Sequence, residues 1–295
     1  MLLYSIYKLI IKKPMQNFAL LISAMGHACW DNILSWLVLN DPDVSLLHML
    51  WIRMFIISFI LCSITFFKKI HTNLSWVWWL KFSIIGWVIP NIAYSISVLW
   101  TGYRISVSFQ PFIPLLVALR IRKKLSVQHY CALILTLFGT FFIWISVEWK
   151  HELWMIWFAL MASVIQVLCL TEWFVMLDDI KEKQFLHIVR GITLGVWIMF
   201  IVMIIWTPQH LEAAFVYRVD AWFFIMIASS ATISCKYWVM SYFLKNMSSD
   251  SVAIFECIHP VATLCLEVAK GHTKFEWQDI VSICLYTLGW ILYPK

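Results

Sequence analysis

The chain has 295 residues, of which 62% are apolar and 13% are charged, and its formal net charge is +6. A soluble globular domain has roughly 25% charged and 45–50% apolar residues, so this composition excludes an ordinary cytosolic enzyme and a disordered chain. Apolar stretches of about 20 residues recur along the whole sequence, which predicts an integral membrane protein. The basic residues lie in the short segments between these stretches, where they contact lipid headgroups, so a lipid bilayer and no nucleic acid is the expected partner.

The first expected element is a short apolar run, residues 1–14, which ends in Lys12-Lys13-Pro14. This run is too short to span a bilayer, so we expect an interfacial helix there. Ten spans follow it, over residues 17–39, 44–67, 75–99, 103–120, 127–147, 152–176, 184–206, 220–244, 250–269 and 276–293. Lipid offers no partner for backbone N–H and C=O groups, and no strand-like alternation is present, so the predicted fold class is an all-α integral membrane protein.

Lys and Arg are unevenly distributed between the two sets of loops. The segments that would share a side with the N-terminus hold most of them, including Lys123, Lys124 and Lys181, whereas the opposite segments hold few, such as Lys150 and Arg218. Because cytoplasmic loops carry the excess of basic residues, we expect both termini in the cytoplasm, with the protein in a bacterial inner membrane. An even number of spans agrees with this orientation.

The two halves of the sequence look related. Arg53 follows "LLHMLWI" in the second span and Arg190 follows "QFLHIV" in the seventh, and proline occurs in "SFQPFIP" of the fourth span and "FECIHPVA" of the ninth. The expected repeats are residues 15–147 and 148–295. Five spans is an odd number, so related halves would cross the bilayer in opposite directions, which is the inverted repeat of many secondary transporters.

With these proline-bearing spans, the half-length repeat and the segments "PFIPLLVAL" and "HPVATLCLE", the sequence resembles the ten-helix drug/metabolite transporter superfamily, EamA type, over residues 15–293. The resemblance implies ten transmembrane helices in two inverted five-helix repeats and a secondary transport activity. No loop of the form G-x-x-x-x-G-K-[ST] is present in the sequence, so we expect neither ATP-driven transport nor a cofactor.

Ionisable residues deep in the expected spans are the informative ones for function. They are Asp31, Arg53, Arg190, Lys236 and Glu256. On insertion scales each costs ~2.5–3.5 kcal/mol at a helix centre, so each must pair with an opposite charge, face water or hold a ligand. Arg53 and Arg190, at equivalent places of the two repeats, fit a structural or gating role as well as a ligand contact.

Helical spacing groups some polar residues on shared faces. His27 and Asp31 are four residues apart with Trp30 beside them, and Glu256 and His259 are three apart. A metal site in a helix bundle needs at least two Glu-x-x-His pairs and further carboxylates, so we expect no metal here.

Together these residues predict an acidic, titratable wall and a basic wall around a central cavity. The acidic wall comprises His27, Asp31, Glu256 and His259, and the basic wall comprises Arg53, Arg190 and Lys236. The alternative is a set of permanent ion pairs that lock helix packing, Asp31 with Arg53 or Glu256 with Lys236.

Prolines and aromatic residues extend the candidate site. Pro90, Pro111 and Pro260 interrupt spans, and the kinks they cause would serve gating. Asn91 and Tyr94 follow Pro90 and are candidate substrate contacts. Three tryptophans deep in the spans, Trp30, Trp87 and Trp238, would give an aromatic wall that attracts a cationic group.

These features predict a secondary transporter of a small polar metabolite that works by alternating access, driven by a coupled proton or by exchange. Buried charges of both signs favour a zwitterionic substrate such as an amino acid or an S-adenosylmethionine-like compound. The expected substrate-binding residues are His27, Trp30, Asp31, Asn91, Tyr94, Arg190, Lys236, Trp238, Glu256 and His259. One alternative is an exporter of hydrophobic or cationic drugs, and an alternative of another class is an intramembrane lipid-modifying enzyme.

Overall fold

The computed structural model describes residues 14–40, 46–65, 74–122, 125–146, 152–180, 184–206, 221–244, 248–269 and 276–293, whose regular structure is all helical. The helices of the first half are α2 (Pro14–Asn40), α3 (Leu46–Thr65), α4 (Trp76–Ser83), α5 (Ile89–Ser108), α6 (Ile113–Arg122) and α7 (Val127–Ser146). Those of the second half are α8 (Leu153–Asp179), α9 (Gln184–Trp206), α11 (Ala221–Leu244), α12 (Ser249–Ala253), α13 (Ile258–Ala269) and α14 (Trp277–Leu292). A π-helical turn, η1 (Ile84–Val88), joins α4 to α5, and the 3₁₀ segments η2 (Gln110–Phe112) and η4 (Ile254–Cys257) precede α6 and α13.

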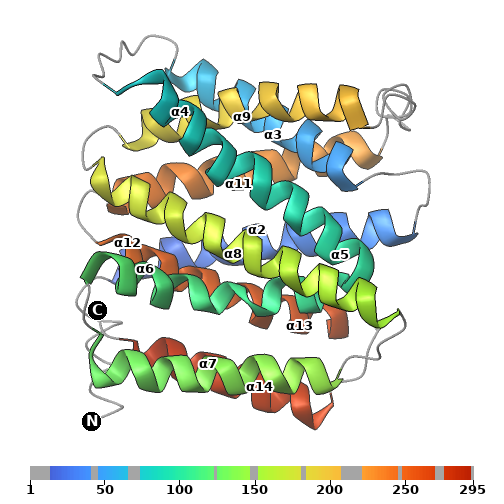
Figure 1. Ribbon diagram of the computed structural model, residues 1–295, viewed down its shortest axis with the longest axis vertical. Helices are drawn as coiled ribbons and strands as arrows, with labels where there is room; N and C mark the ends of the chain where they lie inside the picture. Colours follow the sequence, from blue (N-terminus) through green and yellow to red (C-terminus); the bar gives the residue numbers. More distant parts are fainter. Residues whose placement is uncertain are drawn as a thin grey trace.

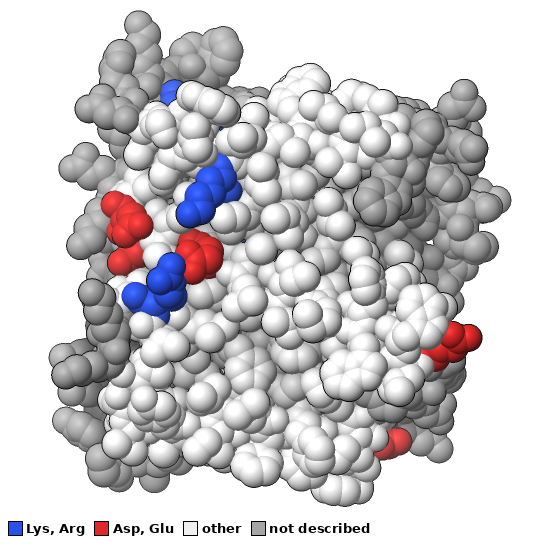
Figure 2. All heavy atoms as spheres, viewed as in Figure 1, with Lys and Arg blue, Asp and Glu red and all other residues white. Residues whose placement is uncertain are grey.

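The composition of these helices makes the chain an integral membrane protein. Within the described residues, seven segments are long and apolar enough to cross a bilayer. Large apolar side chains cover their outer faces, and Phe138, Phe141 and Phe158, for example, are each more than half exposed. Charged side chains gather near the left edge of the view, with further acidic ones near the right edge, and the middle of this face is uncharged (Figure 2). An apolar belt between two polar edges is the surface that a bilayer requires.

The predicted all-α fold is confirmed, and the helices end within a few residues of the expected spans. Residues 1–13 of the expected interfacial segment lie outside the described residues. The third and fourth spans, Trp76–Gly102 and Arg104–Ile121, are separated at Gly102. Gly102 has φ +77°, a left-handed conformation that glycine adopts without the steric penalty of a Cβ.

Irregular helical turns lie beside the three prolines. Pro111 is inside the 3₁₀ segment η2, Pro260 is the third residue after η4, and Pro90 is the second residue after the π-helical turn η1. Proline lacks a backbone donor and clashes with the preceding turn, so the backbone departs from regular α geometry at these places. The predicted interruptions are therefore present; their part in gating stays a prediction.

The helices form a bundle in which segments distant in sequence pack together. The helix pairs in contact include α7 with α14, α5 with α8, α2 with α11 and α13, and α3 with α9. α7 and α14 lie together at the lower edge of Figure 1, and α2 lies in the middle of the bundle. The start of α2 and the end of α14 lie at the same, left-hand edge of the view (Figure 1). We call this edge the terminal face.

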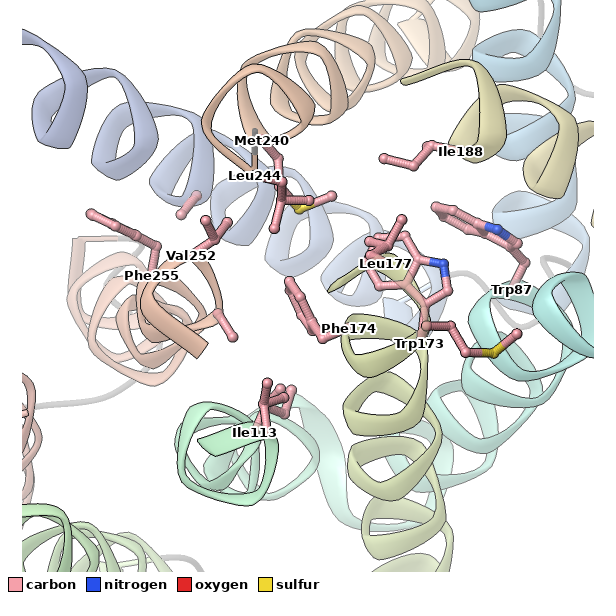
Figure 3. Close-up of a cluster of buried hydrophobic side chains, with 14 of the residues drawn as sticks. Trp87, Ile113, Trp173, Phe174, Leu177, Ile188, Met240, Leu244, Val252 and Phe255 are labelled. Carbon is pink, nitrogen blue, oxygen red and sulfur yellow. The ribbon is translucent and has the colours of Figure 1, made fainter. Parts of the chain in front are cut away.

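Two apolar clusters lie toward the opposite ends of the bundle. The cluster near the terminal face joins η1, α6, α8, α9, α11, α12 and η4 (Figure 3). Its members include Trp87, Ile113, Trp173, Phe174, Leu177, Ile188, Met240, Leu244, Val252 and Phe255. The cluster toward the other face comprises Leu34, Leu46, Met49, Leu50, Tyr94, Val98, Val107 and Met226. Between the two clusters lies the polar centre of the protein.

Candidate functional site

A cavity of about 100 Å³ lies at the middle depth of the bundle. Its walls come from α2, α3, η1, α5, η2, α8, α9, α11, η4 and α13, so both halves of the chain contribute. Asp31 and Arg53 line it from the first half, and Lys236 and Glu256 line it from the second. The structure therefore brings four of the five deep ionisable residues to one place.

A continuous chain of polar contacts begins at Arg53. Its Nη1 donates a hydrogen bond to Oδ1 of Asp31, and Oδ2 of Asp31 lies 3.4 Å from Nε2 of His27. The other ring nitrogen of His27, Nδ1, is 2.7 Å from Nζ of Lys236. An ammonium can only donate, so Nδ1 accepts, and the neutral imidazole carries its proton on Nε2, toward Asp31.

The chain continues from Lys236 to the second carboxylate. Nζ of Lys236 is 2.7 Å from Oε1 of Glu256, and Oε2 of Glu256 is 3.4 Å from Nε2 of His259. The rings of His27 and His259 meet edge to face, with centroids 4.9 Å apart and an interplanar angle of 73°. The two ion pairs are thus connected into one network through the imidazoles.

Local helix geometry explains this convergence. His27 and Asp31 are four residues apart in α2, so they share a face. Glu256 lies in the 3₁₀ turn η4, in which residues three apart eclipse each other, and this aligns it with His259. The helices that carry His27, Asp31 and Lys236, α2 and α11, are long, but in the described residues their polar side chains make them less apolar than the seven candidate spans.

The buried charges of the cavity are stable only as ion pairs. Asp31, Arg53 and Lys236 are all more than nine-tenths buried, so each ion has given up most of its hydration. Removing one partner of a buried ion pair costs about 3–5 kcal/mol because the other charge stays buried and uncompensated. The Asp31–Arg53 and Glu256–Lys236 pairs weighed in the sequence are both present. All four residues of these pairs line the cavity, so they can also contact a bound substrate.

Asn91 and Tyr94, which follow Pro90 in the sequence, also belong to the wall of the cavity. Nδ2 of Asn91 donates to the carbonyl oxygen of Trp87 at 2.5 Å and lies 3.2 Å from Sδ of Met54. The hydroxyl of Tyr94 is 2.8 Å from Oγ of Ser35. Asn91, Tyr94 and Pro90 all line the cavity. That Asn91 and Tyr94 contact the substrate stays a prediction.

The cavity wall includes Trp87, as expected from its depth in the third span, and residues that the sequence did not single out, Gln166 and Trp173. Gln110, Gln166, Trp87 and Trp173 line the cavity and are buried. Oε1 of both glutamines and Nε1 of both indoles have no hydrogen-bond partner among the described residues. The signal for Gln166 was present in the sequence, since a carboxamide in the middle of an apolar helix needs a polar partner as an acid does.

Three predicted contacts lie away from the cavity. Arg190 is exposed, with its guanidinium carbon 5.6 Å from the centroid of the Trp79 ring. Trp238 is 60% exposed, and Trp30 donates from Nε1 to Oγ1 of Thr232 at 3.0 Å. The placement of Arg190, Trp238 and Trp30 among the substrate-binding residues is therefore not supported by the geometry.

For Arg190 and Trp238 the reason is their angular position on α9 and α11. Two residues correspond to a rotation of about 200° in an α-helix, nearly the opposite face. Trp238 is two residues from Lys236, and Arg190 is two residues from Ile192, and both Lys236 and Ile192 line the cavity. A side chain two positions away on the same helix accordingly faces outward.

The network also contains donor atoms of the kind that bind metals. One ligand atom each from His27, Glu256 and His259 lies within 4.8 Å of the others. However, the Lys236 ammonium is within 2.7 Å of His27 and of Glu256, so a protein cation already lies between two of these donors. The expectation that no metal binds stays a prediction.

A second group of charges lies at the ends of helices opposite the terminal face. Nε of Arg104 donates to Oε2 of Glu267, and its Nη1 is 3.4 Å from Oδ1 of Asp279. Oγ of Ser146 donates to the same Asp279 oxygen at 3.2 Å. These contacts tie the start of the fourth span to α7, α13 and α14.

Comparison with known proteins defines the fold and leaves the family open. No family model matches the chain, and no curated protein matches it in sequence. The crystal structure of one protein matches it with a TM-score of 0.70, over 93% of this chain and 97% of that chain, at 14% sequence identity. At this identity the likeness shows the fold alone.

Proposed function

We propose that the protein is a secondary transporter of a small zwitterionic metabolite of the amino-acid class. The observation that carries this proposal is the convergence of two acidic and two basic side chains on one cavity at the middle depth of the membrane. Charges at this depth are costly and mark substrate or ion pathways in membrane proteins. A substrate that bears both a carboxylate and an ammonium matches both signs.

The size of the cavity favours a small amino acid. One water molecule needs about 10–15 Å³ of such a volume, so a cavity of about 100 Å³ holds on the order of seven to ten non-hydrogen atoms. Serine, threonine and valine are of this size, whereas an S-adenosylmethionine-like compound is much larger. The basic groups beside both carboxylates also disfavour a hydrophobic cation as the substrate, because Arg53 and Lys236 would repel it.

Transport by alternating access between two inverted repeats is the mechanism we propose. The helix contacts support it. If each span of the first half corresponds to the span five positions later in the second half, a contact between two spans has a counterpart between the two corresponding spans. The contact of α2 with α11 then becomes that of α8 with α5, and the contact of α2 with α13 becomes that of α8 with α6. The paired 3₁₀ segments η2 and η4, which contact each other, fit the same relation, and this is also the arrangement that the resemblance to the EamA-type transporters implies.

A coupled proton fits this network. His27 bridges Asp31 and Lys236, and His259 lies beside Glu256, so each carboxylate has an imidazole as a neighbour. Histidine takes and releases a proton near neutral pH more readily than any other side chain. Exchange of one solute for another needs no proton, and dependence of uptake on a pH gradient distinguishes the two modes.

Uptake into proteoliposomes tests the proposed function. We expect saturable uptake of labelled small amino acids, and at least tenfold loss of it in Asp31→Asn and in Lys236→Met, because each substitution leaves one charge of a pair without its partner. Lys81→Met removes an exposed lysine of α4 outside the cavity and should transport normally. Absence of uptake of every amino acid by the unmodified protein, or full uptake by both site variants, would contradict the proposal.

A further inference from the structure

All carboxylate oxygens that line the cavity in the described part of the chain already face a basic group. In Asp31, Oδ1 accepts from Arg53 and Oδ2 faces His27. In Glu256, Oε1 lies 2.7 Å from Lys236 and Oε2 lies 3.4 Å from His259. An ammonium group that enters the cavity therefore finds no vacant anion, and it can be bound only by displacing a group of the protein.

Lys236 is the group best suited to be displaced. Its ammonium is a point charge at the end of a flexible stem of four carbons, whereas the guanidinium of Arg53 is planar and less free to turn. The backbone carbonyl of Arg53 also accepts a hydrogen bond from Ser230 at 3.3 Å, which ties that part of α3 to α11. Moreover, among the residues that the structure describes, two acceptors hold Lys236, Nδ1 of His27 and Oε1 of Glu256.

We propose that Lys236 is a tethered ammonium whose place is taken by the ammonium of the substrate. The substrate nitrogen binds between His27 Nδ1 and Glu256 Oε1, and the released Lys236 pairs with the substrate carboxylate inside the same cavity. This inference rests on the proposed function and adds the recognition mode. Both charges that the exchange separates are paired again, so the charge balance of the site is unchanged.

The exchange selects its ligands by a simple rule. A zwitterion supplies an anion for the released Lys236, whereas an alkylamine of the same carbon skeleton supplies none. The amine would leave a lysine charge unpaired in the middle of the membrane, where an isolated charge is costly. Lys236 therefore makes the site bind amino acids and reject the corresponding amines.

Pairs of ligands that differ only in the carboxylate test this rule. Serine with ethanolamine, alanine with ethylamine, and valine with isobutylamine are suitable pairs, and their binding to the purified protein is measured by ligand-dependent shifts in thermal unfolding. We expect the unmodified protein to bind the preferred amino acid at least tenfold more tightly than its amine. Equal affinities for both members of each pair would overturn the exchange, and this measurement needs no variant.

Substitution of Lys236 should reverse the preference. In Lys236→Met the Glu256 carboxylate has no resident ammonium, so the amine should bind at least tenfold more tightly than to the unmodified protein, and the amino acid at least tenfold more weakly. In the double variant Lys236→Met/Glu256→Gln the gained amine binding should disappear, and Lys81→Met should keep the original preference. Amine binding that survives in the double variant would place the amine elsewhere and overturn the proposal.

The outcomes separate the two proposals. If the unmodified protein neither binds nor transports any zwitterion, the proposed function fails. If it transports amino acids but Lys236→Met, eluting as a folded monodisperse species, retains the original preference, then only the exchange of ammonium groups fails.

Discussion

At the scale of single residues, one glycine sets how closely the helices near the terminal face approach. A Cβ at Gly86 would lie 2.4 Å from Cδ1 and 2.7 Å from Nε1 of Trp173, so only glycine lets this indole lie against η1. The Trp173 ring in turn meets the Trp87 ring edge to face, with centroids 5.4 Å apart. Figure 3 shows both indoles in the apolar cluster that covers the cavity on this side. The missing side chain of Gly86 is thus a requirement of the packing between η1 and α8.

We expect Gly86→Ala to destabilise the protein by about 1–3 kcal/mol, the usual cost of extra volume in a packed interior. Thermal unfolding in detergent, followed by tryptophan fluorescence, measures the change. Ala231→Val adds volume at an exposed position of α11 and should leave the unfolding temperature nearly unchanged. An equal effect of the two substitutions would show that the contact with Trp173 is not tight in solution.

At the scale of helices, Arg104 joins elements from both halves of the chain. It is the first residue of the fourth span, two residues after the left-handed Gly102, and it contacts Glu267 of α13 and Asp279 of α14. The side chains of Arg104 and Glu267 are 12% and 19% exposed, so water screens this pair only in part. One guanidinium therefore holds two carboxylates together at the end of the bundle opposite the terminal face.

Removing this guanidinium should be harmful because it leaves two acidic groups close to each other. We expect Arg104→Met to lower the free energy of unfolding by about 1–3 kcal/mol, less than for a fully buried pair because the site is partly hydrated. The double variant Arg104→Met/Glu267→Gln should recover part of this loss, since one of the two like charges is gone. Chemical or thermal unfolding of the two variants checks this, and no recovery in the double variant would argue against electrostatic repulsion as the cause.

At the scale of the whole molecule, the described helix ends give the topology. The start of α2 and the end of α14 lie at the same face of the bundle, and the charged side chains in the space-filling view lie toward the two edges (Figures 1 and 2). An even number of crossings has this result, and the excess of Lys and Arg on the side of the termini predicts that this face is cytoplasmic.

Tags at the two termini should accordingly report the same compartment. A protease should remove an N-terminal and a C-terminal tag from inverted membrane vesicles and spare both in right-side-out vesicles, whereas a tag between α9 and α11 should behave in the opposite way. Cleavage of the two terminal tags in different vesicle orientations would contradict the predicted topology.

The helices of this protein could be predicted from the sequence because the bilayer imposes a length of about 20 apolar residues on each span. The charged centre could be predicted for a similar reason, since Asp31, Lys236 and Glu256 are too costly to leave unpaired, and the structure places them around one cavity. Both arguments rest on large free energies, those of exposing apolar residues to water and of leaving a charge unpaired in the membrane. These free energies depend little on the exact packing of side chains.

The features that could not be predicted depend on how each helix is rotated about its axis and on how side chains pack between helices. Arg190 and Trp238 lie at suitable depth but on the wrong faces of α9 and α11, and depth alone does not fix the rotation of a helix about its axis. The π-helical turn Ile84–Val88 and the orphan indole nitrogen of Trp173 arise from tertiary packing, for which a single sequence has no local pattern.

The equal numbers of cations and anions in the cavity bear on how the proposed carrier responds to voltage. Arg53 and Lys236 balance Asp31 and Glu256 while the imidazoles are neutral, and a zwitterion adds no charge. Moving one elementary charge through 100 mV is worth about 2.3 kcal/mol, and here neither the empty nor the loaded site has a net charge to move. On this basis the membrane potential does no work on either step, and any electrical current recorded during transport counts coupled protons alone.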